Sequence, residues 1–314
     1  MARKRPTAPE TLLAIAYVGS HAYHLVRSTN PQKPVPFVNA RGRLEEPQFI
    51  VNPRLDPGAT FLIWDANAFY NSLQMELVKR LTHGLRFKGA FTWSKSIDDS
   101  VTPTLQPTGT SPAASLATDH RFNRGLAPHN IGRQFVGNWS YDLPFGSHSG
   151  GEKYLLDGWQ LGGILTAADG PPYSAFVGFS RSFPFVSGGS QAGDRADLAP
   201  GRSNNPILGG PNKYFDPTAF LLQPPGVMGN VAEDTMIGPG LVSLDISLSK
   251  STPITEQVRL LFRAEFFNSL NRANFALPNG NIFQTNGAYS GSAGRIQSTA
   301  TNSREIQFGL SLTF

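Results

Sequence analysis

The sequence predicts an all-β fold, specifically an antiparallel transmembrane β-barrel. Three observations lead to this prediction: the residue pattern of the last segment, the alternation of short and long connections, and the composition. Only 16% of the 314 residues are charged, whereas 32 are glycine, 25 are proline and 22 are phenylalanine. Such a composition is poor in helix formers and rich in residues that favour turns and strands.

The last segment, residues 306–314, alternates between apolar and small or polar residues at every position. Because successive side chains of a strand point to opposite faces, its apolar residues share one face. These residues are Ile306, Phe308, Leu310, Leu312 and Phe314. The pattern is typical of the last strand of a bacterial outer-membrane barrel, and we expect this strand to contact the barrel-assembly machinery. The final strand of a soluble sandwich alternates as well.

Three strands are expected in the first third of the chain. The first, Thr11–Val18, is apolar almost throughout. The second, Tyr70–Arg80, places apolar residues at alternate positions from Leu73, and a tight turn at 82–84 follows it. The third, Leu85–Trp93, alternates over its whole length, which is the period of a strand.

Four more strands are expected before the last. Ile131–Leu143 and Leu155–Ala168 carry large apolar or aromatic residues on one side and flank a turn that contains two adjacent glycines. Leu241–Lys250 is the clearest internal strand, because serine or aspartate separates its apolar residues. Val258–Asn268 follows a short turn and places apolar and charged residues on opposite sides.

The connections between these eight strands alternate in length. Short connections are expected at 81–84, 144–154 and 251–256, and long ones at roughly 20–69, 96–130, 169–240 and 269–302. Compact soluble domains rarely contain several structureless loops longer than about 15 residues. Outer-membrane barrels combine short periplasmic turns with long extracellular loops. Because every short turn here falls at the same end of the strands, the alternation favours a barrel.

Charged residues indicate which face of the strands is wet. In Val258–Asn268, the residues Arg259, Arg263 and Glu265 share one face, and the apolar residues share the other. A lipid-facing Arg or Lys near the middle of the bilayer costs about 2–4 kcal/mol, so the charged face is predicted to line the lumen. Asp245 is predicted to face the lumen too, and to pair with Arg263 across the short turn.

Aromatic residues are expected at the two membrane interfaces. Tyr141, Trp159 and Phe314 fall at the predicted periplasmic ends of their strands, and Trp93 falls at an outer end. Aromatic girdles at both interfaces are characteristic of outer-membrane barrels. These positions agree with the orientation that the connections predict.

The sequence contains no pattern that predicts an enzyme, a cofactor or a metal. It has no cysteine, P-loop, dinucleotide fingerprint or nucleophile elbow, so we expect no catalytic, cofactor-binding or metal-binding residues. His21 and His24 have the spacing of a ligand pair but no acidic partner nearby, and are interpreted as loop residues. Asp98, Asp99 and Asp119 are interpreted as solvated residues of an external loop.

The net charge of +5 includes no long basic run, which argues against a nucleic-acid partner.

We expect the bacterial outer membrane as the location, provided that an export signal is supplied upstream. No stretch approaches the roughly 18 apolar residues of a spanning helix. Basic residues at 3–5 precede the apolar run 12–18, which superficially resembles a signal peptide. That run is short and no small-residue cleavage site follows it, so it is predicted to be a strand and no signal peptide is predicted.

Several short motifs match those of a known family in order and spacing over nearly the whole chain. They are Tyr17-Val18-Gly19-Ser20, Tyr70-Asn71-Ser72-Leu73-Gln74, His83-Gly84-Leu85, the run 91–99, Asp142-Leu143-Pro144-Phe145-Gly146, Gly158-Trp159-Gln160-Leu161, Phe215-Asp216-Pro217-Thr218-Ala219-Phe220 and Arg263-Ala264-Glu265-Phe266-Phe267-Asn268 with Asn271, Asn274 and Phe275. With these motifs the chain resembles the TonB-dependent receptors, specifically their Oar-like branch.

The resemblance implies a barrel of about 22 strands with a plug inside its lumen. Residues 1–314 then form the C-terminal portion of that barrel, about eight strands, without the plug. TonB is expected as a partner only in a full-length relative that carries the plug. The implied role is ligand uptake or passage across the outer membrane, with 20–69 and 169–240 contributing to capture. The ligand is unknown, and the apolar faces are expected to contact outer-membrane lipid.

Two alternatives remain open. Eight strands are enough for a self-contained outer-membrane barrel with a structural or adhesive role, although Thr11–Val18 alternates poorly for a closing strand. In the second alternative, the chain is a soluble β-sandwich that acts as a binding module.

Overall fold

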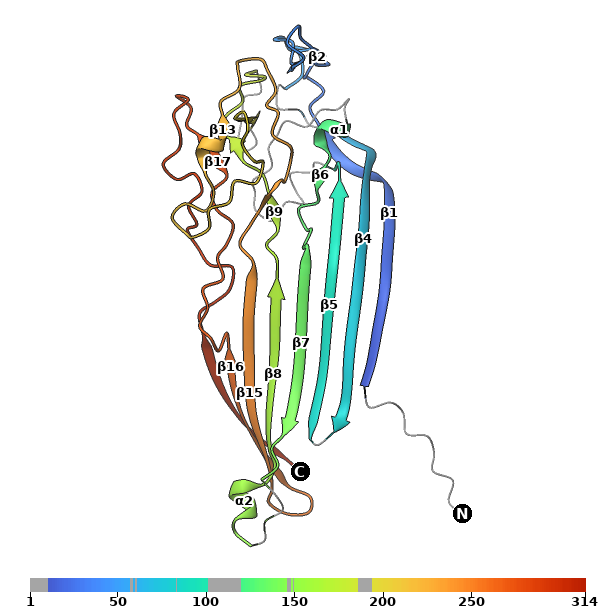
Figure 1. Ribbon diagram of the computed structural model, residues 1–314, viewed down its shortest axis with the longest axis vertical. Helices are drawn as coiled ribbons and strands as arrows, with labels where there is room; N and C mark the ends of the chain where they lie inside the picture. The colour runs from blue at the N-terminus through green and yellow to red at the C-terminus, as the bar shows by residue number, and fades with distance from the viewer. Residues whose placement is uncertain are drawn as a thin grey trace, which may run out of the picture.

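The computed structural model describes residues 11–56, 59, 61–82, 84–100, 120–145, 148, 150–185 and 194–314. A tall antiparallel sheet forms much of the molecule, and a lobe of loops and short strands lies at one end of it (Figure 1). The short turns and the helix α2 (Lys153–Leu156) lie at the other end. No helix in the described ranges is long and apolar enough to cross a membrane.

Eight long strands of the described chain form the sheet in the order in which they occur, and all neighbours pair antiparallel. They are β1 (Thr11–Thr29), β4 (Phe61–Thr82), β5 (Leu85–Asp98), β7 (Arg133–Asp142), β8 (Trp159–Ala168), β15 (Leu241–Pro253), β16 (Arg259–Phe267) and β18 (Glu305–Thr313). A short strand, β6 (Gly125–Leu126), also pairs with β5. The antiparallel all-β fold and all eight predicted strands are therefore confirmed.

Two strands are much longer than predicted. β1 continues to Thr29 and β4 begins at Phe61, so both reach into the stretch 20–69 that was predicted to be a loop. The two strands go on pairing with each other beyond the rim of the sheet (Figure 1). β8 is shorter than predicted, because α2 occupies the positions just before it.

His21 and His24 consequently lie within β1 and not in a loop, which corrects the sequence-based interpretation. The register with β4 shifts between Ala22 and Leu25, and His24 has a positive φ of 57° at this irregularity. The ring of His21 stacks on that of Phe69 with 3.7 Å between the centroids. Packing and local geometry therefore account for both histidines.

The register divides the sheet into one apolar and one polar face. Residues directly opposite each other in an antiparallel pair share a face, so rows of partners can be followed across the strands. Three apolar rows are Leu77, Gly89, Gly137, Leu165, Leu244; Phe87, Trp139, Gly163, Ile246, Phe266, Ile306; and Leu85, Tyr141, Leu161, Leu248, Ala264, Phe308. The row Arg86, Ser140, Gly162, Ser247, Glu265, Gln307 belongs to the polar face.

The residues predicted to face the lumen lie together on this polar face. Arg263 and Arg259 are two and six positions from Glu265 along β16, and Asp245 is two positions from Ser247 on β15. All four predicted residues therefore share the face defined by the Ser247–Glu265 row. The register shows that these residues share a face but does not show what the face lines, so their orientation towards a lumen stays a prediction.

The predicted ion pair between Asp245 and Arg263 is wrong. The register places Ser249 opposite Arg263, whose Nη1 lies 3.5 Å from Oε1 of Glu265 on the same strand. Asp245 Oδ1 instead accepts a hydrogen bond of 2.8 Å from the backbone N–H of Asn268. The geometry of the β15–β16 turn sets this register, and strand alternation alone does not determine it.

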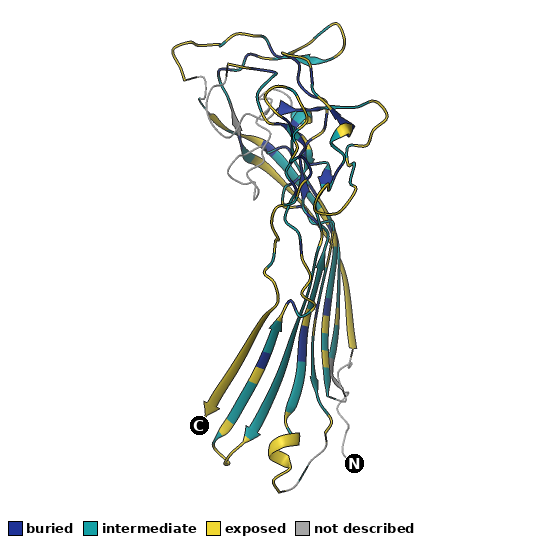
Figure 2. Ribbon diagram, turned by 90° about the vertical axis from the view of Figure 1, so that its left-hand side faces the viewer, coloured by how far each residue is buried: buried dark blue, intermediate teal, exposed yellow. Residues whose placement is uncertain are grey.

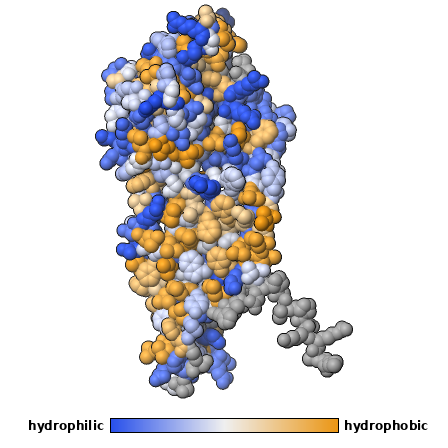
Figure 3. Space-filling model, in the orientation of Figure 1, coloured by the Kyte–Doolittle hydropathy of each residue, from blue (hydrophilic) through white to orange (hydrophobic). Residues whose placement is uncertain are grey.

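The terminal segment has the length of a membrane-spanning β-strand. From Ile306 to Phe314 the chain advances eight positions, which is about 26 Å at 3.3 Å per residue. A transmembrane β-strand has about 9–11 residues and is tilted in the bilayer. Tyr141 and Trp159 lie near the short-turn end of the sheet, and Trp93 lies nearer the lobe. Figure 3 shows apolar residues gathered across the strands below the more hydrophilic lobe.

The sheet is open. Within the described chain, β1 pairs only with β4 and β18 only with β16, and the two edges lie on opposite sides of the sheet (Figure 2). The eight strands therefore do not close on themselves as a self-contained barrel.

The apolar face is not the core of a sandwich. The other sheets in the described residues have only two or three strands. Phe308 is 68% exposed, and its ring stacks beside that of Phe262 on the same open face, with centroids 6.4 Å apart. The β-sandwich alternative is therefore wrong.

The long connections fold together into a lobe, here called the cap, which comprises the described residues of 30–59, 169–240 and 268–304. Its short elements are β2 (Phe37–Val38), β3 (Leu44–Glu45), β9 (Pro172–Tyr173), β10 (Phe176–Val177), β11 (Asp194–Arg195), β12 (Asp197–Leu198), β13 (Phe220–Leu221), β14 (Met236–Ile237), β17 (Asn281–Phe283) and the 3-10 helix η1 (Pro217–Ala219). The helix α1 (His120–Asn123) lies beside it. Tyr173, Phe215, Phe220, Met236 and Ile282 belong to its buried core. These connections are therefore not structureless, which corrects the sequence-based prediction.

The two faces predict effects of different size for the same substitution at adjacent positions. Ile246→Lys places an ammonium in the middle of the apolar face, and we expect it to lower the free energy of unfolding in a lipid bilayer by about 2–4 kcal/mol. Ser247→Lys, its matched control, lies on the polar face opposite Glu265 and is expected to cost less than about 1 kcal/mol. Urea titration of the folded protein in vesicles, followed by tryptophan fluorescence, measures both. Equal losses would contradict the assignment of the faces.

Candidate functional site

A cavity of about 490 Å³ lies where the cap meets the polar face of the sheet. Its floor is formed by the cap-side ends of β7, β8 and β15, where Gln134, Ala168 and Leu241 are register partners. Thr166, two positions before Ala168, also lines it. The strand register thus places this cavity on the same face as the predicted lumen-lining residues.

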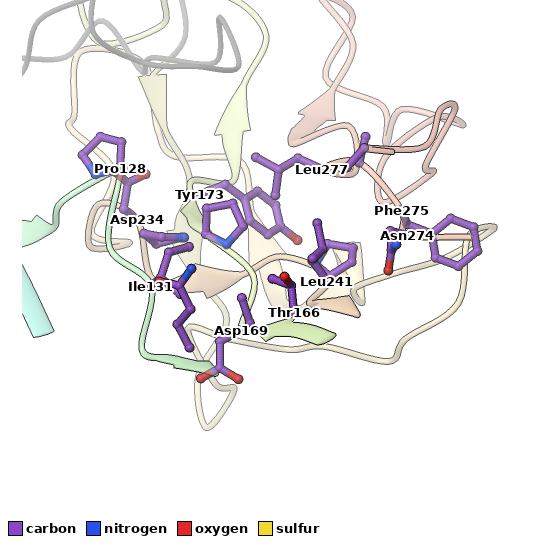
Figure 4. Close-up of a pocket in the computed structure, with 17 residues that line it drawn as sticks. Pro128, Ile131, Thr166, Asp169, Tyr173, Asp234, Leu241, Asn274, Phe275 and Leu277 are labelled. Carbon is purple, nitrogen blue, oxygen red and sulfur yellow. The ribbon is translucent and has the colours of Figure 1, made fainter. Parts of the chain in front are cut away.

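The cap supplies the other walls. The chain leaves β8 through residues 169–172 and returns to β15 through 237–240, while β9 and β14 pair Tyr173 with Met236 between them. Residues 274–277 come from the connection between β16 and β18, and Pro128 and Ile131 come from the segment before β7 (Figure 4). Segments far apart in the sequence therefore converge on one space.

The two segments that join β8 and β15 to the cap touch each other beside the cavity. A Cβ atom on Gly170 would lie 1.9 Å from the carbonyl oxygen of Gly238, a distance that no side chain tolerates. Glycine is therefore required at position 170 for this close backbone approach. The contact fixes one wall of the cavity relative to the sheet.

The lining is mostly apolar and rigid. It includes Pro128, Ile131, Pro171, Pro172, Pro239, Leu241, Phe275 and Leu277. Prolines have no backbone N–H, so these walls offer few hydrogen-bond donors. No lysine or arginine is found among the described residues that line the cavity. The carboxylate of Asp169 points away from it (Figure 4) and pairs with Arg133 at 2.8 Å.

Tyr173 places an unpaired hydroxyl in these surroundings. Its side chain is buried, its Oη has no hydrogen-bond partner among the described residues, and it points towards the middle of the lining side chains (Figure 4). Burial raises the pKa of this phenol far above its usual value, and the nearby Tyr214 adds to the shift. The group therefore stays neutral and is an available donor at physiological pH.

Asp234 is the buried carboxyl group of the wall. Its Oδ1 accepts a hydrogen bond of 2.8 Å from Ser174 Oγ, which in turn accepts one from the Asp234 backbone N–H. Burial raises the pKa of Asp234 to about 6, against the lowering effects of Ser174 and Arg195. Its backbone has a φ of 49°, in the left-handed region that non-glycine residues rarely adopt. The surrounding cap must hold this conformation in place.

A buried ion pair lies next to Asp234. Arg195 Nη2 donates to Glu233 Oε2 at 2.9 Å, and both side chains are almost inaccessible. The guanidinium carbon lies 3.9 Å from the centroid of the Phe122 ring, and Nη1 donates to the Phe122 carbonyl. Burial raises the pKa of Glu233 more than the arginine lowers it. This pair joins the cap to α1.

The four residues predicted to line the lumen, Asp245, Arg259, Arg263 and Glu265, are not among the residues that line the cavity. The terminal strand lies at the edge of the sheet, with its apolar residues on the opposite face. The predictions located the polar face correctly as one surface. They did not locate the cavity at its end.

The acidic residues predicted to be solvated behave differently. Asp99 is buried, accepts a hydrogen bond from the Asn67 backbone N–H at 2.5 Å and lies 2.9 Å from Nδ1 of His120, so that interpretation is wrong for it. Asp119 lies outside the described residues. In the described ranges no group of three or more His, Asp or Glu side chains is arranged to hold a metal ion.

The sequence analysis missed Tyr173, Asp234 and the Arg195–Glu233 pair. Each lies in an irregular connection whose apolar residues follow no period. The one relevant signal was the run 215–220, which carries three residues of the cap core but was noted only as part of the resemblance. The arrangement suits binding of a small molecule, because it combines a preformed apolar space with a buried donor that has no partner.

A family model described as an outer membrane beta barrel domain matches residues 4–307, nearly the whole chain. No curated protein matches the sequence.

Breaking the buried ion pair should loosen the cap. Arg195→Met leaves Glu233 buried without its partner, which typically costs about 3–5 kcal/mol. The matched control is Arg202→Met, because Arg202 pairs with Asp216 at an exposed position, where an ion pair contributes at most about 1 kcal/mol. Limited proteolysis is expected to cleave the cap of Arg195→Met much faster than that of Arg202→Met. Similar cleavage rates would contradict a structural role for the buried pair.

The raised pKa of Asp234 predicts that the stability of the cap depends on pH. Its folded-state pKa of about 6 exceeds the ordinary value of 3.8 for an aspartate, so the protonated form stabilises the fold. That contribution is fully present below pH 3.8 and is lost as the pH rises through 6, at most about 3 kcal/mol. We expect Asp234→Asn to remove this part of the dependence, so that the two proteins differ in protease resistance more at pH 7.5 than at pH 4. A difference that does not change with pH would contradict the shifted pKa.

Proposed function

The chain belongs to the outer membrane beta barrel family, and from that premise we propose that it forms the receptor barrel of a TonB-dependent system that captures a ligand and passes it across the outer membrane. Membership places the protein in the bacterial outer membrane, with the apolar face against lipid. The polar face then lines the lumen, and the cap lies at the extracellular side. We propose a role in transport and not in catalysis.

The observation that carries this proposal is the cap itself. The connections 169–240 and 268–304 pack into one buried core at the end of the sheet, and both line a cavity on the polar face. Such a cap offers a preformed surface above the lumen, which a receptor requires and a purely structural barrel does not. The motifs shared with Oar-like receptors support the same reading.

The open edges support a larger barrel. In hydrocarbon, unpaired backbone groups of an edge strand cost several kcal/mol each, so membrane sheets close. Within the described chain, β1 and β18 each have one neighbour and lie apart. We infer that further strands complete the barrel between them, as in the approximately 22-stranded transporters.

Uptake by cells tests the proposed function. Cells that carry the complete receptor gene, cells with the gene deleted and cells that lack TonB are grown in the same complex medium, and small molecules left in the medium are compared by mass spectrometry. We expect at least one compound to be depleted only by the first strain. Depletion without TonB would refute energy coupling, and identical media from the first two strains would refute the receptor role.

A further inference from the structure

The cavity between the cap and the polar face has the properties of a binding site for one chemical class. We propose that it binds an uncharged, largely apolar small molecule that carries a carbonyl or ether oxygen, which accepts a hydrogen bond from Tyr173 Oη. This inference deepens the proposed receptor function and rests on it.

Size and lining define the apolar part of the ligand. Protein interiors are close-packed, and preformed ligand sites typically have volumes of about 300–1,000 Å³. The cavity, at about 490 Å³, falls within this range and is lined mainly by apolar side chains. Its walls come from four separate segments of the chain, and the contact between Gly170 and Gly238 holds two of them together. The space is therefore not closed by the collapse of one loop.

The charges of the lining residues make the cavity unfavourable for an anionic ligand. No cationic side chain is present among the described lining residues, and Asp234 contributes a carboxyl group to the wall. A carboxylate or phosphate in this space would lose its hydration without gaining a partner, which is strongly unfavourable. An uncharged ligand avoids this cost.

The hydroxyl of Tyr173 defines the polar part. A buried donor without a partner is unfavourable and calls for an explanation. The other tyrosine hydroxyls in the described part of the cap are satisfied: Tyr289 donates to the Phe220 carbonyl at 2.9 Å, and Tyr214 donates to the Ile237 carbonyl at 3.1 Å. The amide of Asn274 is also engaged, since its Oδ1 accepts from Val242 and its Nδ2 donates to Thr301. Among the described residues that line the cavity, Tyr173 thus supplies the buried donor that has no partner, and it is available to a ligand oxygen.

Photolabelling of the complete receptor, purified and folded in detergent, tests the inference. Benzophenone is the probe, because it is uncharged, apolar and carries a carbonyl oxygen. Its anionic analogue, 4-benzoylbenzoate, has nearly the same shape. Peptide mapping after irradiation distinguishes labelling of the cavity from labelling of surfaces that contact the micelle. We expect saturable labelling of peptides containing Tyr173 or residues 274–277 by benzophenone and little labelling by the anion.

Three variants sharpen the test. Tyr173→Phe removes only the donor and should raise the half-saturating benzophenone concentration about five- to tenfold. Tyr289→Phe, the matched control, loses a hydroxyl that is already satisfied elsewhere in the cap and should leave it unchanged. Ala276→Trp fills the cavity and should abolish labelling of the lining peptides, while gel mobility before and after boiling verifies that each variant is folded.

The inference is overturned if labelling of the lining peptides does not saturate, if the anion labels them equally, or if Tyr173→Phe behaves like Tyr289→Phe. Its failure is distinguishable from failure of the proposed function. A protein that supports uptake in cells but shows no cavity labelling retains the receptor role and loses this site. A protein that binds benzophenone in this manner but supports no uptake retains the site and loses the transport role.

Discussion

The register of the sheet is the constraint on which the rest of the structure depends. Side chains alternate between faces with a period of two, so a slip of one residue would move every apolar side chain of a strand to the polar face. Across the sheet the rows stay consistent from Leu85 to Phe308. Small residues take part in this order. At Gly163 a Cβ atom would lie 2.3 Å from the Trp139 ring, so the indole occupies the space that a side chain would need. The apolar face is therefore continuous because large and small residues complement each other across neighbouring strands.

The same register places the cap. Each hairpin of the sheet sends its long connection to the same end, so connections that are distant in sequence emerge side by side. Arg43 and Asp197 form an ion pair at 2.5 Å between the first of these connections and the third. The isolated bridge between Glu45 and Val227 joins the same two segments. The cavity arises where this packed lobe fails to fill the space above β7, β8 and β15. The strand order thus determines where the cavity lies. The cap residues that face the sheet determine its chemistry.

Local alternation predicted the strands, because an apolar residue at every second position is a property of the chain itself. It could not predict features set by contacts between distant segments. The continuation of β1 and β4 past Val18 and before Tyr70 depends on their pairing with each other, since histidine, serine and asparagine there give no apolar period. The partner of Arg263 depends on the turn that fixes the hairpin register. Phe215, Met236 and Ile282 meet only in three dimensions, so no window of sequence contains the cap core. The donor at Tyr173 was hidden for the same reason.

In the proposed function, the contrast between the cavity and the polar face bears on how passage is driven. The cavity is apolar and has no described cation, whereas the polar face beneath it carries Arg86, Lys88, Glu76, Arg263 and Glu265. An uncharged apolar ligand gains contacts in the cavity that this charged wall does not offer. Movement from the cap into the lumen is then unfavourable for such a ligand on its own. Capture and translocation would therefore be separate steps, the first driven by burial of apolar surface and the second dependent on an external source of work. A receptor coupled to TonB has that source, whereas a passive channel would hold the same ligand at its rim.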